Sequence, residues 1–278
     1  MSAGDTGIMR LGIGSYTYPW AVGIPGHVPA DPLTAIGLLE KARELGVHVV
    51  QICDNLPLDA MSATELDELR HAAAECKITV ELGTRGIAAE HLRRQIELCR
   101  MFRSPILRVV VDTATHHPSP DEVVELLRPM VPELESAGVC LAIENHDRFT
   151  ARAFSEIVSR LDSRCVGICL DTANSFGALE GPETIVTSLA PWVVNLHLKE
   201  FAIHRMPHML GFVIEGRPAG QGRLDIPWLL AKLRDQRCAA SAILEQWTPP
   251  EPTLAATIAK EDAWARESVR YLRSLVPN

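Results

Sequence analysis

Short apolar segments alternate along the chain with longer segments in which apolar residues recur at the spacing of an α-helix. The short segments are rich in Val, Ile and Leu, which is typical of strands buried on both faces of a parallel sheet. We expect eight strands, at residues 11–16, 47–53, 78–82, 106–112, 139–144, 165–171, 192–198 and 241–245. We expect helices between them, among others at residues 31–45, 63–76, 88–102 and 120–137. This alternation predicts a sheet whose parallel strands are connected by helices.

Two architectures fit eight such units, a closed (β/α)8 TIM barrel and an open, doubly wound sheet. A barrel of this type needs about 250 residues, and the chain has 278. No G-x-G-x-x-G sequence follows the first expected strand, where an open sheet would bind a dinucleotide. We therefore expect a single TIM barrel domain over residues 1–278, with one long loop after the seventh strand at about residues 199–225.

The strongest chemical signal is the residue type at the ends of the last four strands. The fifth, sixth and eighth strands end in Glu144, Asp171 and Glu245, and the seventh contains His197. The carboxyl ends of barrel strands converge on one face, so these four side chains are expected to meet. One such acid alone is commonly a helix N-cap, but four polar ends on consecutive strands are harder to explain that way.

Three carboxylates in one pocket repel each other, and a divalent cation removes that cost. The expected ligands are therefore Glu144, Asp171, His197 and Glu245. Oxygen and nitrogen ligands of this kind suit Mn²⁺ or Mg²⁺, which we favour, and also Co²⁺ or Zn²⁺.

A metal that chelates a carbonyl oxygen and a neighbouring hydroxyl stabilises an enediolate. Isomerisation, epimerisation, dehydration and decarboxylation of a keto sugar all pass through such an intermediate. Our main hypothesis is a sugar isomerase or epimerase that acts next to the carbonyl of a keto sugar or sugar acid. The alternative within the enzyme class is a decarboxylase.

Four short motifs resemble the xylose isomerase-like TIM barrel superfamily, which includes sugar isomerases and epimerases, inosose dehydratase and the type IV apurinic endonucleases of AP endonuclease family 2. The motifs are Glu144-Asn-His146, Leu-Asp171-Thr-Ala-Asn174, His197-Leu-Lys199 and Gly220-Gln-Gly222-Arg-Leu-Asp225. The resemblance implies that Glu144, Asp171, His197 and Glu245 hold the metal, and that Glu144 and Glu245 also move protons. Endonucleases of the superfamily have a His for a three-zinc cluster where this chain has Asn174, so a trinuclear site is not expected. Many sugar epimerases have a substrate-binding His at the same position, so Asn174 leaves the hydroxyl pattern of the substrate open.

The long loop carries an unusual density of basic groups, which are suited to binding a carboxylate or phosphate. The alternative is that they simply face water. The sequences Arg205-Met-Pro-His208-Met-Leu-Gly-Phe and Leu-Glu245-Gln-Trp247 resemble the branch of the superfamily that includes 3-oxo-isoapionate decarboxylases, which implies a 3-oxo sugar acid as substrate. We expect Lys199 to be catalytic together with the two glutamates, and we expect substrate contacts from His146, Asn174, His204, Arg205, His208, Arg217 and Trp247.

Composition narrows the functional classes. A net charge of −8 argues against binding a phosphate backbone, so a nucleic acid partner is not expected. No apolar run approaches the length of about 20 residues that a membrane helix needs. Seven scattered cysteines without a C-x-x-C pair fit a soluble protein in a reducing cytoplasm. We expect a homo-oligomer only because soluble enzymes commonly form one. The rival functions are an endonuclease and a catalytically silent barrel that binds sugar or a partner protein.

Overall fold

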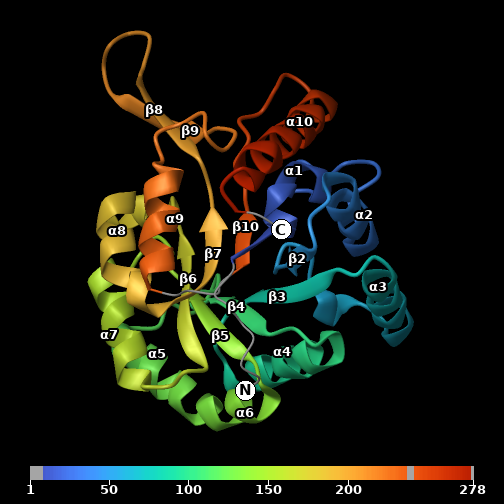
Figure 1. Ribbon diagram of the computed structural model, residues 1–278, viewed down its shortest axis with the longest axis vertical. Coiled ribbons are helices and arrows are strands. Elements are labelled where there is room, and N and C mark those ends of the chain that lie inside the picture. The colour runs from blue at the N-terminus through green and yellow to red at the C-terminus, as the bar shows by residue number, and fades with distance from the viewer. Residues whose placement is uncertain (1–8, 237–240, 277–278) are drawn as a thin grey trace.

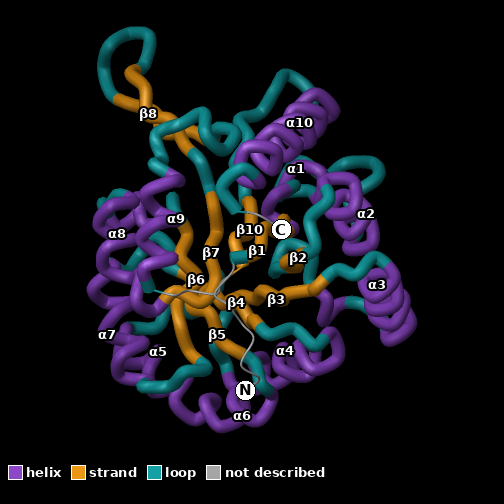
Figure 2. Tube along the Cα trace, viewed as in Figure 1, coloured by secondary structure: helices purple, strands orange, loops and turns teal. Residues whose placement is uncertain are grey.

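The computed structural model describes residues 9–236 and 241–276, and its central feature is a closed barrel of eight parallel strands (Figures 1 and 2). Around the barrel the strand order is β1-β10-β7-β6-β5-β4-β3-β2. The strands are β1 (Arg10–Gly14), β2 (Val49–Ile52), β3 (Thr79–Arg85), β4 (Ile106–Val110), β5 (Cys140–Glu144), β6 (Val166–Asp171), β7 (Val193–Leu198) and β10 (Ser241–Leu244). The predicted TIM barrel is therefore confirmed.

Helices surround the barrel and bury their apolar faces against its outer surface. They are α1 (Pro19–Val22), α2 (Ala35–Leu45), α3 (Ala63–Glu75), α4 (Ala89–Phe102), α5 (Pro120–Leu127), α6 (Val131–Ala137), α7 (Ala151–Leu161), α8 (Pro182–Leu189), α9 (Ile226–Asp235) and α10 (Leu254–Arg273). None of the helices in the described ranges combines the length and the apolar character that crossing a membrane requires.

Two of the expected helices are shorter in the structure than their apolar pattern suggested. The first begins at Ala35 instead of residue 31, because the side chain of Thr34 accepts a hydrogen bond from the Gly37 amide and caps the helix there. The helix expected at 120–137 is divided into α5 and α6 by a 3-10 turn that contains Pro129. Proline has no amide hydrogen for the helical ladder, which explains the interruption.

The long loop expected after the seventh strand contains a β-hairpin. Strands β8 (Phe201–Arg205) and β9 (Phe212–Gly216) pair antiparallel and project from the barrel in Figure 1. Both strands carry aromatic and β-branched residues, which favour extended backbone. The turn between them includes Gly211 and Met209 in the left-handed region, at φ 86° and 65°. The hairpin differs from the expected loop, because short exposed strands leave little apolar pattern in the sequence.

Candidate active site

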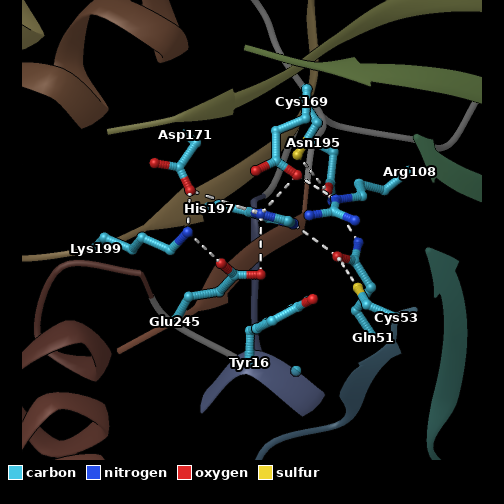
Figure 3. A network of polar contacts seen from close by, with 12 residues as sticks. Tyr16, Gln51, Cys53, Arg108, Cys169, Asp171, Asn195, His197, Lys199 and Glu245 are labelled. Carbon is cyan, nitrogen blue, oxygen red and sulfur yellow. Dashed lines mark hydrogen bonds and ion pairs between the residues drawn. The ribbon is translucent and has the colours of Figure 1, made fainter. Parts of the chain in front are cut away.

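The structure brings the four expected ligand residues together at the carboxyl ends of their strands. Figure 3 labels three of them, Asp171, His197 and Glu245. All four are at most 1% exposed. Nδ1 of His197 lies 3.1 Å from Glu245 Oε1, 3.6 Å from Glu144 Oε2 and 3.9 Å from Asp171 Oδ2. Asp171 and His197 are also direct neighbours across the pairing of β6 with β7. The register of the parallel strands therefore brings residues that are far apart in the sequence into one cluster.

Asp171 serves two purposes with its two oxygens. Oδ1 accepts hydrogen bonds from the backbone amides of Ala173 and Asn174, at 2.8 and 2.9 Å. Oδ2 points to the cluster, where it contacts Lys199. Asp171 thus binds nearby backbone amides, as a lone acid at a strand end often does, but it uses only Oδ1 for this. Oδ2 is directed to the cluster.

Arg108 on β4 is a member of the site that sequence analysis did not identify. Its side chain is 3% exposed, donates a hydrogen bond to Glu144 Oε2, and lies 2.8 Å from Asp54 Oδ1. Burial opposes ionisation of Glu144, but the guanidinium charge, with smaller contributions from His197 and Lys199, lowers the pKa of Glu144 to about 2. The sequence feature that could have identified Arg108 is its position as the single charged residue of an apolar strand, Ile-Leu-Arg-Val-Val.

Lys199 is the second cation of the cluster. Its Nζ lies 2.8 Å from Asp171 Oδ2 and 2.8 Å from Glu245 Oε2. Burial alone would lower the pKa of Lys199, but the surrounding carboxylates raise it well above its usual range. The pKa of Asp171 is raised by burial, which Lys199 only partly offsets. Arg108 and Lys199 together therefore already reduce the repulsion among the three carboxylates that the sequence predicted.

The donor set of the cluster nevertheless fits a divalent cation. Nε2 of His197 lies 2.7 Å from the amide oxygen of Gln51, which has no hydrogen to donate, so the proton is on Nε2. Nδ1 of His197 and Oε1 of Glu245 are then two acceptors facing each other at 3.1 Å, and neither forms a hydrogen bond in the described structure. A cation bound between them would make both atoms ligands, which is the physical reason that they fit a metal.

Cys169 lies beside the same group of ligand atoms, together with Glu144 and His197. Its Sγ is 3.2 Å from Asn195 Oδ1, to which the thiol donates. Burial raises the pKa of this thiol well above its usual range, so it stays protonated. A neutral thiol is a poor ligand for Mg²⁺ or Mn²⁺, which bind oxygen, and the cysteine is therefore not counted among the ligands.

A cavity of about 510 Å³ opens directly beside the cluster and contains several expected residues. Lys199, Asn174 and Trp247 lie on its wall. Asn174 donates to Glu144 Oε1 at 2.7 Å, while its own amide oxygen lies 3.3 Å from Lys199 Nζ. The remaining lining residues are Tyr16, Pro19, Trp20, Ile24, Ile214, Glu215, Gly216, Gln246, Thr248, Pro249 and Pro250. The cavity is thus mainly apolar, with its cation and amide on the side of the cluster.

The structure does not bring the other basic residues to this cavity wall. Arg205 stacks on the Phe212 ring within the hairpin, at 4.5 Å from the ring centroid. His208 accepts a hydrogen bond from the Leu210 amide at the hairpin turn. These two residues therefore contact their own hairpin, and their binding of substrate stays a prediction.

Three further expected residues also have acidic partners outside the cluster. His204 lies 3.9 Å from Glu215, and Arg217 lies 2.5 Å from the same carboxylate. Glu215 and Gly216 line the cavity, and Arg217 directly follows them in the sequence without lining it. His146 pairs with Asp147 at 3.1 Å. Substrate contacts by these three residues are likewise untested predictions.

Comparison with known proteins places this geometry in a family. The family described as xylose isomerase-like TIM barrel matches residues 39–275. The chain is 36% identical over 269 residues to a 3-oxo-isoapionate decarboxylase of Pectobacterium atrosepticum, which covers 97% of both proteins. Among solved structures, it is similar in fold to a D-psicose 3-epimerase with D-tagatose from Clostridium cellulolyticum, with a TM-score of 0.72, 16% identity, and coverage of 96% and 99%. A xylose isomerase-like TIM barrel protein from Mycobacterium smegmatis in complex with magnesium has a TM-score of 0.67, 14% identity, and coverage of 95% and 97%.

Proposed function

The chain belongs to the xylose isomerase-like TIM barrel family, and from this premise we propose that it is a divalent-metal-dependent decarboxylase of a 3-oxo sugar acid. The observation that carries the proposal is Lys199, whose ammonium group joins the carboxylate cluster to the wall of the cavity. The full-length similarity to a 3-oxo-isoapionate decarboxylase supports this reaction over others of the family.

Glu144, Asp171, His197 and Glu245 would hold the metal, because Nδ1 of His197 lies within 3.9 Å of an oxygen of each of the three carboxylates. When bound, the ion would supply a Lewis acid for the oxygens of a substrate. Mn²⁺ or Mg²⁺ is the proposed ion, since three of the four ligand side chains are carboxylates.

In a 3-oxo acid, the bond between C1 and C2 breaks, and its electron pair forms the C2–C3 double bond. The former C3 carbonyl oxygen becomes an enolate, carbon dioxide leaves, and C2 finally takes a proton from water. Lys199 supplies a positive charge on the cavity wall where that enolate oxygen develops. Fixed charges placed at a developing oxyanion are commonly the largest contribution to catalysis.

The positions of hydrogen bonds at Glu144 also favour decarboxylation over epimerisation. Both oxygens of Glu144 already accept hydrogen bonds, one from Arg108 and the other from Asn174. Epimerisation needs a proton-transferring group on each face of the reacting carbon, whereas decarboxylation needs a stabilised enolate and a single proton. A carboxylate held in this way is better suited to binding than to exchanging protons.

Incubation of the Mn²⁺-loaded protein with 3-oxo sugar acids in D₂O tests the proposal by proton NMR and mass spectrometry. We expect release of carbon dioxide with one deuterium at the vacated carbon. Lys199→Met should slow the release about 100- to 1,000-fold, whereas Lys260→Met, at a surface ion pair with Glu251, should not. Deuterium uptake without carbon loss would reject decarboxylation in favour of an isomerase or epimerase.

A further inference from the structure

A group of polar side chains crosses the barrel interior beside His197. Gln51 on β2, Glu81 on β3, Asn195 on β7 and Ser241 on β10 are each at most 4% exposed. None of them lines the cavity of the candidate site. Burial of polar groups is costly compared with an apolar core, so a complete network of this kind calls for a reason.

Glu81 is the acceptor on which the group converges. Its Oε2 accepts from Ser241 Oγ at 2.8 Å, and from the amide nitrogens of Gln51 and Asn195 at 3.3 Å each. The amide of Asn195 also donates to Ser241 Oγ at 2.7 Å, so its own orientation is determined. Its oxygen accepts from Gln51 Nε2 at 3.0 Å.

These contacts decide which end of the Gln51 amide faces His197. Only the NH₂ end can donate to Glu81 and to the Asn195 oxygen, so the amide oxygen must point the other way. That oxygen lies 2.7 Å from His197 Nε2 and accepts a hydrogen bond from its N–H group. The other ring nitrogen, Nδ1, keeps its lone pair and faces the carboxylates (Figure 3).

We propose that Gln51, held by Glu81 and Asn195, is a positioning residue that keeps His197 in the tautomer with a proton on Nε2 and a free lone pair on Nδ1. This inference rests on the proposed metal site, because only that tautomer presents Nδ1 as a ligand. Partners that orient metal-binding histidines commonly affect metal affinity about 10- to 100-fold. Glu81 acts through Gln51, since it contacts Gln51 and Asn195 but forms no hydrogen bond or ion pair with His197 among the described contacts.

The experiment compares Gln51→Met with the wild type by titration with Mn²⁺ and by ¹H–¹⁵N NMR of the imidazole nitrogens. Methionine has about the volume of glutamine, but its thioether sulfur is only a weak hydrogen-bond acceptor for His197 Nε2–H. We expect the Kd for Mn²⁺ to rise about 10- to 100-fold. The wild-type spectrum should show a protonated Nε2 and an unprotonated Nδ1 for His197, identified by its loss in His197→Asn. The variant should lose this single-tautomer pattern.

Gln95→Met is the matched control, because Gln95 is also buried and donates to a carboxylate, that of Asp59, outside the site. This control should leave both the Kd and the spectrum unchanged. Glu81→Gln should weaken Mn²⁺ binding, and combining it with Gln51→Met should add little, because both changes remove the same constraint.

Wild-type protein with the proton on Nδ1, or on both nitrogens at neutral pH, would overturn the inference. An unchanged Kd and spectrum in Gln51→Met would do the same. If wild-type protein binds no Mn²⁺ while His197 still shows the expected tautomer that depends on Gln51, the metal proposal fails and the positioning role stands. If Gln51→Met does not fold, the wild-type spectrum still decides the tautomer.

Discussion

The ammonium nitrogen of Lys199 lies 2.8 Å from Asp171 Oδ2, so that a cation of the chain itself contacts a carboxylate expected to bind a metal. The same nitrogen lies 2.8 Å from Glu245 and lines the cavity. Lys199 is therefore placed to act both within the cluster and on a molecule in the cavity. The first prediction separates these two roles.

Replacing Lys199 with Met should reduce the turnover of the decarboxylase substrate about 100- to 1,000-fold, because a fixed charge at the developing oxyanion is lost. Metal content should be retained, since none of the expected ligands is removed. The measurements are steady-state kinetics and elemental analysis of the same preparation. Full turnover in the variant would show that Lys199 is only a partner of the two carboxylates.

Removal of an expected ligand should remove the metal. Purified protein is expected to contain about one divalent ion per chain, which is lost in Asp171→Ala and in His197→Ala. Elemental analysis after dialysis measures this directly. Asp112→Ala is a suitable control, since this acid pairs with Arg148 outside the cluster. Complete retention of metal in both ligand variants would refute the ligand assignment.

Arg108 should be essential for stability as well as for the site. Arg108→Met leaves the buried Glu144 without its cationic partner and takes one partner from Asp54, which keeps Arg85. Breaking a buried ion pair on one side commonly costs about 3–5 kcal/mol. Urea unfolding should show this loss, while Arg70→Met, at an exposed pair with Asp67, should leave the unfolding midpoint unchanged. A midpoint in Arg108→Met equal to that of the wild type would contradict the assigned role.

Glu261 predicts a dependence of stability on pH. This residue of α10 accepts hydrogen bonds from the backbone amides of Trp20 and Ala21, each at 3.0 Å. Burial raises the pKa of Glu261 to about 8, although these hydrogen bonds lower it. The folded protein holds this proton more tightly than the unfolded chain, whose carboxyl has an ordinary pKa of 4.5. The contribution of the protonated Glu261 to the free energy of unfolding is therefore complete below about pH 4.5 and is lost as the pH rises through about 8.

Urea unfolding at several pH values between these limits tests that sign. As the pH rises, the free energy of unfolding of the wild type should fall by up to about 1.4 kcal/mol per pH unit more than that of Glu261→Gln, whose side chain cannot ionise. Exposed Glu75→Gln should follow the wild type. Equal slopes in the wild type and Glu261→Gln would show that the carboxyl does not change its protonation in this range.

Much of the fold was predictable because local pattern and barrel geometry agree. Eight apolar strands separated by helices are compatible with few folds, and in a barrel the carboxyl ends of the parallel strands lie on one face. The breaks at Thr34 and Pro129 and the hairpin of residues 201–216 were not predicted, because apolar periodicity does not register caps, 3-10 turns or short exposed strands.

The sequence by itself determined the barrel and the meeting of Glu144, Asp171, His197 and Glu245, because strand direction alone brings these ends together. Only the tertiary structure decided which cations enter the cluster. Lys199 and Arg108 contact its carboxylates, whereas Arg205 and His208 contact other residues of the hairpin. It also decided how the Gln51 amide faces the histidine. Such choices depend on distances across the barrel between residues far apart in the chain, and neither spacing nor composition records those distances.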